Sequence, residues 1–179
     1  MAHEIYIPEN LMFQDYIAVI QTARTWADGY DQKRQNSAFL LSALAPQVAV
    51  DYSNVVAAWG IKHYTADEFA ALWLSEEHLG LPPLATQHLL GQPLFKSVTA
   101  DEIVVKWQQL ASHGRRPDGE QKGSGGGPPV VSETSDGRSY MEHRFVKQAD
   151  GRWKIASITP SLLYTTGDFM RIRRPVGAE

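Results

Sequence analysis

The sequence contains no cysteine among its 179 residues. Without thiols there is no disulfide, no CxxC metal site, no iron–sulfur cluster and no thiol nucleophile. The HExxH, GxSxG, GxGxxG and GxxxxGK(S/T) motifs are missing as well. No two histidines of one predicted element have the spacing of metal ligands. We therefore expect no bound metal and no cofactor.

Long apolar runs and strong basic clusters are also absent. A long stretch without charge, Asn36–Val50, contains Pro46 and is shorter than the roughly 20 apolar residues of a membrane-spanning helix. The densest basic group, Arg171–Arg174, is too small for a nucleic-acid surface. The N-terminal sequence MAHEIYIPEN has neither the basic nor the apolar part of a secretory signal. We expect a soluble, cytoplasmic protein with no membrane and no nucleic-acid partner.

The composition is that of an ordinary globular protein. The sequence has 17 Lys and Arg, 20 Asp and Glu, a net charge of −3 and 43 % hydrophobic residues. A chain of this length buries about 68–70 % of its unfolded surface, which suffices for a core and a pocket. These values predict a single domain over residues 1–179.

Two helices are indicated by apolar spacing and end signals. Between Phe13 and Asp31, apolar positions recur at intervals of three and four, which predicts an amphipathic helix. A capping box at Thr65–Glu68 begins a second helix, for which Gly80 is the predicted stop. A short apolar segment, residues 38–44, ends before a proline.

The rest of the sequence favours strands. Alternation over Val48–Tyr52 predicts one strand, and turn signals separate five further β-rich segments. These segments cover residues 85–90, 96–99, 103–112, 139–147 and 153–158. Residues 114–138 are rich in glycine and proline and are predicted to form a long flexible loop insertion. Helices followed by strands indicate an α+β fold with helices on one face of a mainly antiparallel sheet.

Several polar side chains are expected on inner faces or at element ends. In the segment that begins at Ile103, the odd positions share one face, which ends in His113. Ser139 and Met141 share a face of the next strand, and Tyr30 and Asp31 lie at the end of the first helix. Taken singly, a strand histidine is usually structural, an aspartate at a helix end is usually solvated, and a buried tyrosine is usually core.

The other histidines give weaker signals. His143 follows a charged residue where the alternation shifts, and we interpret it as structural or exposed. His3, His63 and His78 lie in polar loop contexts and are expected at the surface.

Read together, the segments resemble the scytalone dehydratase family, small fungal polyketide dehydratases. The resemblance rests on WADGYDQK at Trp26–Lys33, on Val50–Tyr52, on TQH at Thr86–His88, on Ser112–His113 and on DGRWK at Asp150–Lys154. It implies a cone-shaped α+β barrel of the NTF2-like or SnoaL-like kind, in which N-terminal helices close a curved, mixed, mainly antiparallel sheet. It also implies a homotrimer.

The resemblance assigns catalytic roles to five positions. Tyr30 and Tyr52 correspond to the phenols that hold a water molecule or the substrate carbonyl. His88 and His113 correspond to two imidazoles of the pocket, and Asp31 to the carboxylate that orients and charges one of them. Which histidine is the base and which is the acid stays open.

Four further positions correspond to substrate-binding residues. Trp26 and Phe169 fall where aromatic residues line or cap the cavity, and Ser139 matches a serine that binds the substrate. Met141 departs from the pattern, because the family pattern has an asparagine there. This exchange of a polar group for an apolar one suggests a different substrate.

The function implied is a cofactor-independent dehydratase for a cyclic polyhydroxylated polyketide ketone. The substrate would be scytalone, vermelone or a larger relative from an anthraquinone pathway, in fungal pigment or secondary metabolism. Two alternatives stay open: an isomerase or rearrangement enzyme for a related polyketide, and a non-catalytic module that binds a small ligand, since fold alone does not fix function.

Overall fold

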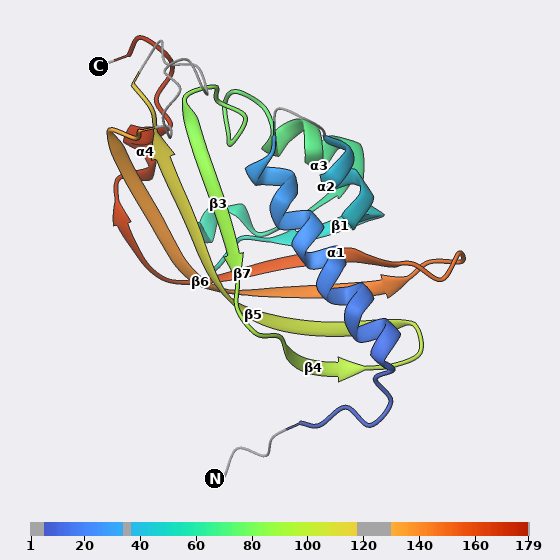
Figure 1. Cartoon of the computed structure of the whole chain (residues 1–179). Coiled ribbons are helices and arrows are strands. Elements are labelled where there is room, and N and C mark those ends of the chain that lie inside the picture. Colours follow the sequence, from blue (N-terminus) through green and yellow to red (C-terminus); the bar gives the residue numbers. More distant parts are fainter. Residues whose placement is uncertain (1–5, 34–36, 118–129, 179) are drawn as a thin grey trace.

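In the computed structural model, helices lie across one face of a curved sheet (Figure 1). The structure describes residues 6–33, 37–117 and 130–178. In chain order the helices are α1 (Phe13–Asp31), α2 (Ser37–Ala43), the 3₁₀-helix η1 (Ala57–Trp59), α3 (Ala66–Trp73) and α4 (Phe169–Ile172). The strands are β1 (Leu44–Asp51), β2 (Ile61–Thr65), β3 (Leu84–Leu90), β4 (Leu94–Val98), β5 (Glu102–Arg115), β6 (Glu133–Lys147) and β7 (Trp153–Gly167).

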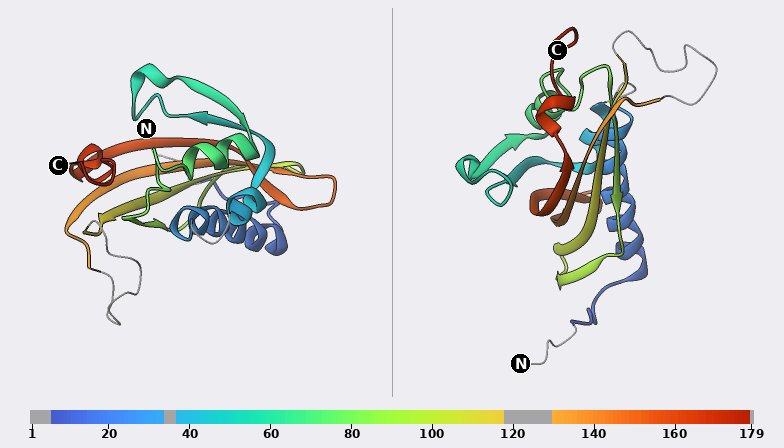
Figure 2. Two further views of the ribbon diagram at one scale, coloured as in Figure 1. Left: turned by 90° about the horizontal axis from the view of Figure 1, so that it is seen from above. Right: turned by 90° about the vertical axis from the view of Figure 1, so that its left-hand side faces the viewer.

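The sheet is mixed and mainly antiparallel, as predicted. Its strand order is β2-β1-β7-β6-β5-β3, and β4 pairs with the other end of β5. The pairing of β1 with β7 is parallel, whereas the other pairs are antiparallel. The two views in Figure 2 show that the sheet curves strongly without closing on itself. The cone is therefore an open one, and its interior lies between the sheet and the helices.

Helix α1 packs on the sheet through an apolar stripe. Val19, Ala23, Trp26 and Tyr30 recur at helical spacing and are buried. At Gly29 an added Cβ would lie 3.0 Å from Leu40, so glycine lets α2 pack closely against the end of α1. This contact fixes the turn of α1 that carries the predicted catalytic residues.

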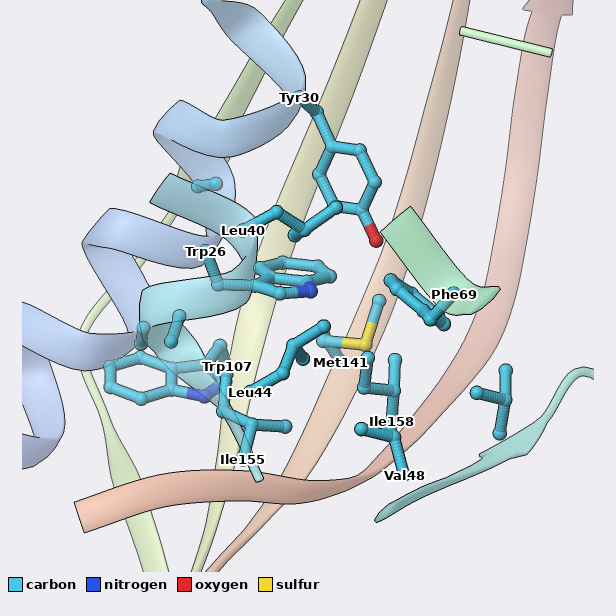
Figure 3. Packing of buried hydrophobic residues seen from close by; sticks show 14 of the residues in the cluster. Trp26, Tyr30, Leu40, Leu44, Val48, Phe69, Trp107, Met141, Ile155 and Ile158 are labelled. Atoms are coloured by element: carbon cyan, nitrogen blue, oxygen red, sulfur yellow. The ribbon is translucent and has the colours of Figure 1, made fainter. Parts of the chain in front are cut away.

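The long strands β5 and β6 line the interior with alternate residues. On β6 the buried side chains are those of Ser135, Ser139, Met141, His143 and Phe145. Figure 3 shows Met141 in the buried cluster, close to Trp26 and Tyr30 of α1. The inner face of the sheet is apolar at one end and polar at the other, and the polar end carries the site.

The structure corrects the predicted element bounds. The loop predicted over residues 114–138 is shorter, because β5 continues to Arg115 and β6 begins at Glu133 through backbone pairing. The remaining loop residues, 118–129, lie outside the described residues. The capping box of α3 is present, but α3 ends at Trp73, and Gly80 instead packs against the carbonyl of Leu74.

Candidate active site

A cavity of about 320 Å³ lies between α1, α3, α4 and the inner face of the sheet. Every predicted site residue except Asp31 lines it, namely Trp26, Tyr30, Tyr52, His88, His113, Ser139, Met141 and Phe169. Asp31 lies behind this wall, where it binds His88. The resemblance therefore selected residues from α1, β3, β5, β6, α4 and the turn after β1 that meet around one space.

Asp31 and His88 form the central hydrogen-bonded pair of the site. His88 donates its backbone N–H to Asp31 Oδ2 at 2.8 Å, and its Nδ1 lies 2.8 Å from Oδ1. A carboxylate oxygen accepts, so Nδ1 is the donor of this hydrogen bond, and Nε2 is left for contacts in the cavity. An aspartate at the end of a helix opposes the helix dipole. The two bonds from His88 offset this cost and hold the carboxylate against the imidazole.

The end of α1 is held against β3 by a second bond. Thr86 donates its hydroxyl to the backbone carbonyl of Tyr30 at 3.1 Å. Thr86 and His88 are two residues apart on β3 and share one face of the strand, so this strand supplies both attachments to the helix. In the sequence TQH, Thr86 therefore holds the end of α1 in place, and His88 provides the imidazole of the candidate site.

His113 lies beside His88 in the cavity wall, on the paired strand β5. The two rings are 5.8 Å apart and nearly perpendicular. His113 Nδ1 lies 3.2 Å from the backbone carbonyl oxygen of Ser135 and donates a hydrogen bond to it. Burial, together with the nearby His88, lowers the pKa of His113 to about 4. His113 is therefore neutral near pH 7 and presents an Nε2 lone pair.

The two phenols of the site are kept protonated. Tyr30 is 3 % exposed, and its ring lies 5.0 Å from that of His88. Tyr52 stacks on Trp73 at 5.2 Å. Burial raises the pKa of Tyr30 and that of Tyr52. Both hydroxyls are thus available as hydrogen-bond donors at neutral pH.

The opposite wall is mostly apolar. Met141 is 3 % exposed, and Pro160 and Leu162 of β7 lie beside it in the cavity lining. Ser139 donates its hydroxyl to Gln109 Oε1 at 3.0 Å. Phe169 of α4 lies 4.8 Å from the His113 ring. The cavity therefore has a wall of titratable groups and a wall suited to a hydrocarbon ring.

Gln109 and Trp73 are among the lining residues that sequence reasoning missed. A signal for Gln109 was present, because it is a polar residue on an otherwise apolar inner face of β5. Trp73 follows the apolar spacing of α3 and could not be told from ordinary core. The surface interpretation of His143 is wrong, because the side chain is fully buried among aromatic rings. His63 is exposed as predicted, His78 is half-buried, and His3 lies outside the described residues.

Among residues 6–33, 37–117 and 130–178, no group of three His, Asp or Glu side chains is arranged to hold a metal ion. No helix in those ranges is long and apolar enough to cross a membrane.

Fold and cavity define a class, the NTF2-like α+β proteins that enclose a pocket between helices and a curved sheet. The chain matches the scytalone dehydratase family over residues 10–176 and belongs to that family. It is 56 % identical to a dehydratase of Aspergillus candidus, cfoI, with 100 % of both chains covered. It is 28 % identical to the scytalone dehydratase of Pyricularia oryzae, over 96 % of this chain and 94 % of that protein.

The fold has solved counterparts. The protein Kfla4162 of Kribbella flavida is 16 % identical and superposes with a TM-score of 0.68, covering 90 % of this chain and 97 % of that chain. This likeness concerns the fold alone.

Proposed function

We propose that the protein is a hydro-lyase that removes water from a cyclic, polyhydroxylated polyketide ketone without a cofactor. The observation that carries the proposal is the Asp31–His88 pair, which lies with His113 and two protonated tyrosines around one largely apolar cavity. Loss of water from a β-hydroxy ketone needs a base for the α-proton, donors for the carbonyl oxygen and a proton for the leaving hydroxyl. The site contains groups for all three tasks.

Tyr30 and Tyr52 act on the carbonyl oxygen. Their hydroxyls donate hydrogen bonds to it, directly or through one water molecule, and stabilise the negative charge of the enolate. In this buried setting the donors are pre-oriented, so their effect on the transition state is larger than in water.

His88 moves the proton. Its Nε2 takes the α-proton of the substrate as the enolate forms, and Asp31 stabilises the resulting imidazolium. The enolate then re-forms the ketone with a new carbon–carbon double bond as the β carbon–oxygen bond breaks. The departing hydroxyl takes the proton from His88 Nε2 and leaves as water, so His88 returns to its neutral form.

His113 has a different task from His88. Among the described residues its ring bonds to a backbone carbonyl and to no carboxylate, and burial keeps it neutral. Its Nε2 therefore accepts a hydrogen bond from the leaving hydroxyl and orients that group toward His88. In this mechanism His88 carries out the base and acid steps, and His113 positions the leaving hydroxyl.

The substrate we propose is scytalone, vermelone or a larger relative from an anthraquinone pathway, in fungal pigment or secondary metabolism. Ligand sites of roughly 300–1,000 Å³ enclose small molecules, and the volume of about 320 Å³ suits a compact ring system. Met141 gives this wall an adaptable apolar surface, which favours an edge with an additional ring or methyl group. The name of the Pyricularia oryzae relative, scytalone dehydratase, supports a substrate of this kind.

We also propose a homotrimer located in the cytoplasm. Exposed apolar side chains on β3 and β7 support self-association, because Leu89, Leu163 and Tyr164 are 41 %, 57 % and 56 % exposed. Light scattering of the purified protein measures the oligomeric state, and fluorescent tagging in cells measures the location. A monomer in solution would contradict the homotrimer, and secretion of the tagged protein would contradict the cytoplasmic location.

The test of the function is incubation of the purified protein with scytalone and with a hydroxylated dihydroanthracenone. Product absorbance and product mass are followed together. We expect a conjugated product lighter by one water molecule. A product of unchanged mass would indicate an isomerase, and unchanged substrate with measurable binding would indicate a ligand-binding module.

A further inference from the structure

A buried amide lies in the apolar wall of the cavity. Gln109 of β5 is 7 % exposed and is paired in register with Ser139 of β6, which is 8 % exposed. Both side chains line the cavity. None of the catalytic steps described above uses Gln109.

The hydrogen bond with Ser139 fixes how the amide is turned. Ser139 donates its hydroxyl to Gln109 Oε1 at 3.0 Å, which occupies the acceptor end of the amide. In the part of the chain that the structure describes, the amino group Nε2 donates to no protein acceptor. Gln109 lines the cavity, so this amino group is available to donate to an acceptor that a ligand brings there.

The amide has a defined place relative to the reacting groups. On β5, Gln109 is two residues from Ala111, or about 7 Å along the strand. Ala111 pairs in register with His88, and Trp107, on the other side of Gln109, pairs with Met141. The amide therefore lies between the proton-transfer wall and the methionine, on the inner face of the sheet.

We propose that Gln109 is a substrate-binding residue that determines specificity: its amino group donates to a ring-borne hydroxyl oxygen of the substrate, beside the apolar edge formed by Met141. The proposal rests on the proposed function and narrows its substrate class. The substrate has an apolar edge at Met141 and an oxygen acceptor next to it, toward β5. Gln109 thus provides on β5 the polar contact that Met141 does not provide on β6.

The test compares a hydroxylated ligand with its bare skeleton. Scytalone carries ring hydroxyls, whereas 1-tetralone keeps the bicyclic ketone and lacks them. The variants are Gln109→Leu and, as a matched control, Gln108→Leu, since Gln108 is the exposed neighbour on the outer face. Quenching of tryptophan fluorescence gives Kd for 1-tetralone and, at early times, for scytalone, and turnover gives KM and kcat for scytalone.

We expect Gln109→Leu to raise Kd and KM for scytalone about 10- to 100-fold, the range for a lost hydrogen bond in a polar recognition site. Kd for 1-tetralone and kcat should change less than about threefold, because neither depends on the amide. Gln108→Leu should leave all values at the wild-type level. The double variant Gln109→Leu, Met141→Asn should recover part of the affinity for scytalone, since it restores one amide to this wall.

Three results bear on the outcome. An unchanged ratio of the two Kd values in Gln109→Leu, with 1-tetralone still bound, would overturn the proposal. Should Gln109→Leu lose 1-tetralone binding, Gln109→Met is measured in its place, and loss in both variants would assign Gln109 a packing role and also overturn it. If the ratio of the Kd values for scytalone and 1-tetralone depends on Gln109 but the protein does not dehydrate scytalone, the proposed function is wrong. The assignment of Gln109 as a binding residue is then still supported.

Discussion

Two buried histidines on the inner face of the same sheet have opposite surroundings. His88 is 6 % exposed, lines the cavity and lies 2.8 Å from the carboxylate of Asp31. His143 is 0 % exposed and lies outside the cavity lining, with its ring 4.5 Å from Trp26. Its two ring nitrogens find no hydrogen-bond partner in the described ranges, and burial lowers its pKa to about 3. Burial alone keeps an imidazole neutral, whereas a carboxylate partner and an open cavity allow it to carry a proton for chemistry.

The largest effect should come from Asp31→Asn, which removes the feature that distinguishes His88 from His143. An amide can still hold the ring, but it does not stabilise the imidazolium. We expect kcat for scytalone to fall about 10²–10⁴-fold, the range of one positioned proton transfer. Initial rates of the two folded proteins measure it. A variant with wild-type kcat would separate the carboxylate from catalysis.

His113→Asn should have the next largest effect, because His113 lines the cavity but has no carboxylate partner. We expect kcat to fall roughly tenfold to 10²-fold, in line with the loss of one positioning hydrogen bond. His63→Asn is the control, since His63 is exposed on β2. Equal rates for His113→Asn, His63→Asn and the wild type would remove His113 from the mechanism.

Met141→Asn changes the apolar wall of the cavity on β6, two residues before the buried His143. An asparagine offers a polar partner to a substrate hydroxyl and takes away adaptable apolar surface. We expect kcat/KM for scytalone to rise about tenfold relative to that for a tricyclic dihydroanthracenone, which corresponds to roughly 1.4 kcal/mol. A wild type that already favours scytalone strongly, and loses that preference in the variant, would exclude a shifted substrate class.

His143→Leu should spare activity and change acid stability. The unfolded histidine titrates near its ordinary pKa of about 6.5, whereas the native one stays neutral down to about pH 3. Between these values the unfolded state binds more protons, so the wild type loses stability as the pH falls below 6.5. From pH 7 to pH 5 this loss is about 2 kcal/mol for one histidine.

The measurement for His143→Leu is urea unfolding at pH 7 and at pH 5. His113 contributes in the same direction in both proteins, so the difference between them isolates His143. We expect the wild type to lose about 2 kcal/mol more than the variant over this interval. An identical loss in both would show that His143 takes up its proton in the native state.

The smallest effect should come from a chelator. The proposed steps use phenols, imidazoles and one carboxylate, so prolonged dialysis against a strong chelator should leave kcat unchanged. Activity that disappears and returns with one divalent ion would contradict the mechanism.

The sequence predicted the helices better than the full extents of the long strands. Apolar spacing gave the bounds of α1 as they stand, and the capping box placed the start of α3. The extension of β7 through Pro160 and the pairing of Glu133 with Arg115 depend on long-range backbone bonds, which local residue patterns do not report.

The site was predicted through several short segments taken together. Apolar alternation placed His113 on an inner face, but only the resemblance joined it to Tyr52 and His88 from other elements. Gln109 escaped because its importance depends on Ser139 across the β5–β6 pair and on the open space beside it. His143 was interpreted as structural or exposed, and the structural alternative holds. Alternation on the strand turns His143 inward and its charged neighbour Glu142 to the opposite face.

The comparison of the two histidines is tested most directly by the rate of water loss from scytalone in the wild type, His88→Asn and His143→Leu, measured side by side at pH 7. The product is quantified by its mass. The account predicts equal product formation by the wild type and His143→Leu, and a rate at least about 10²-fold lower for His88→Asn. Equal rates for the wild type and His88→Asn would contradict it.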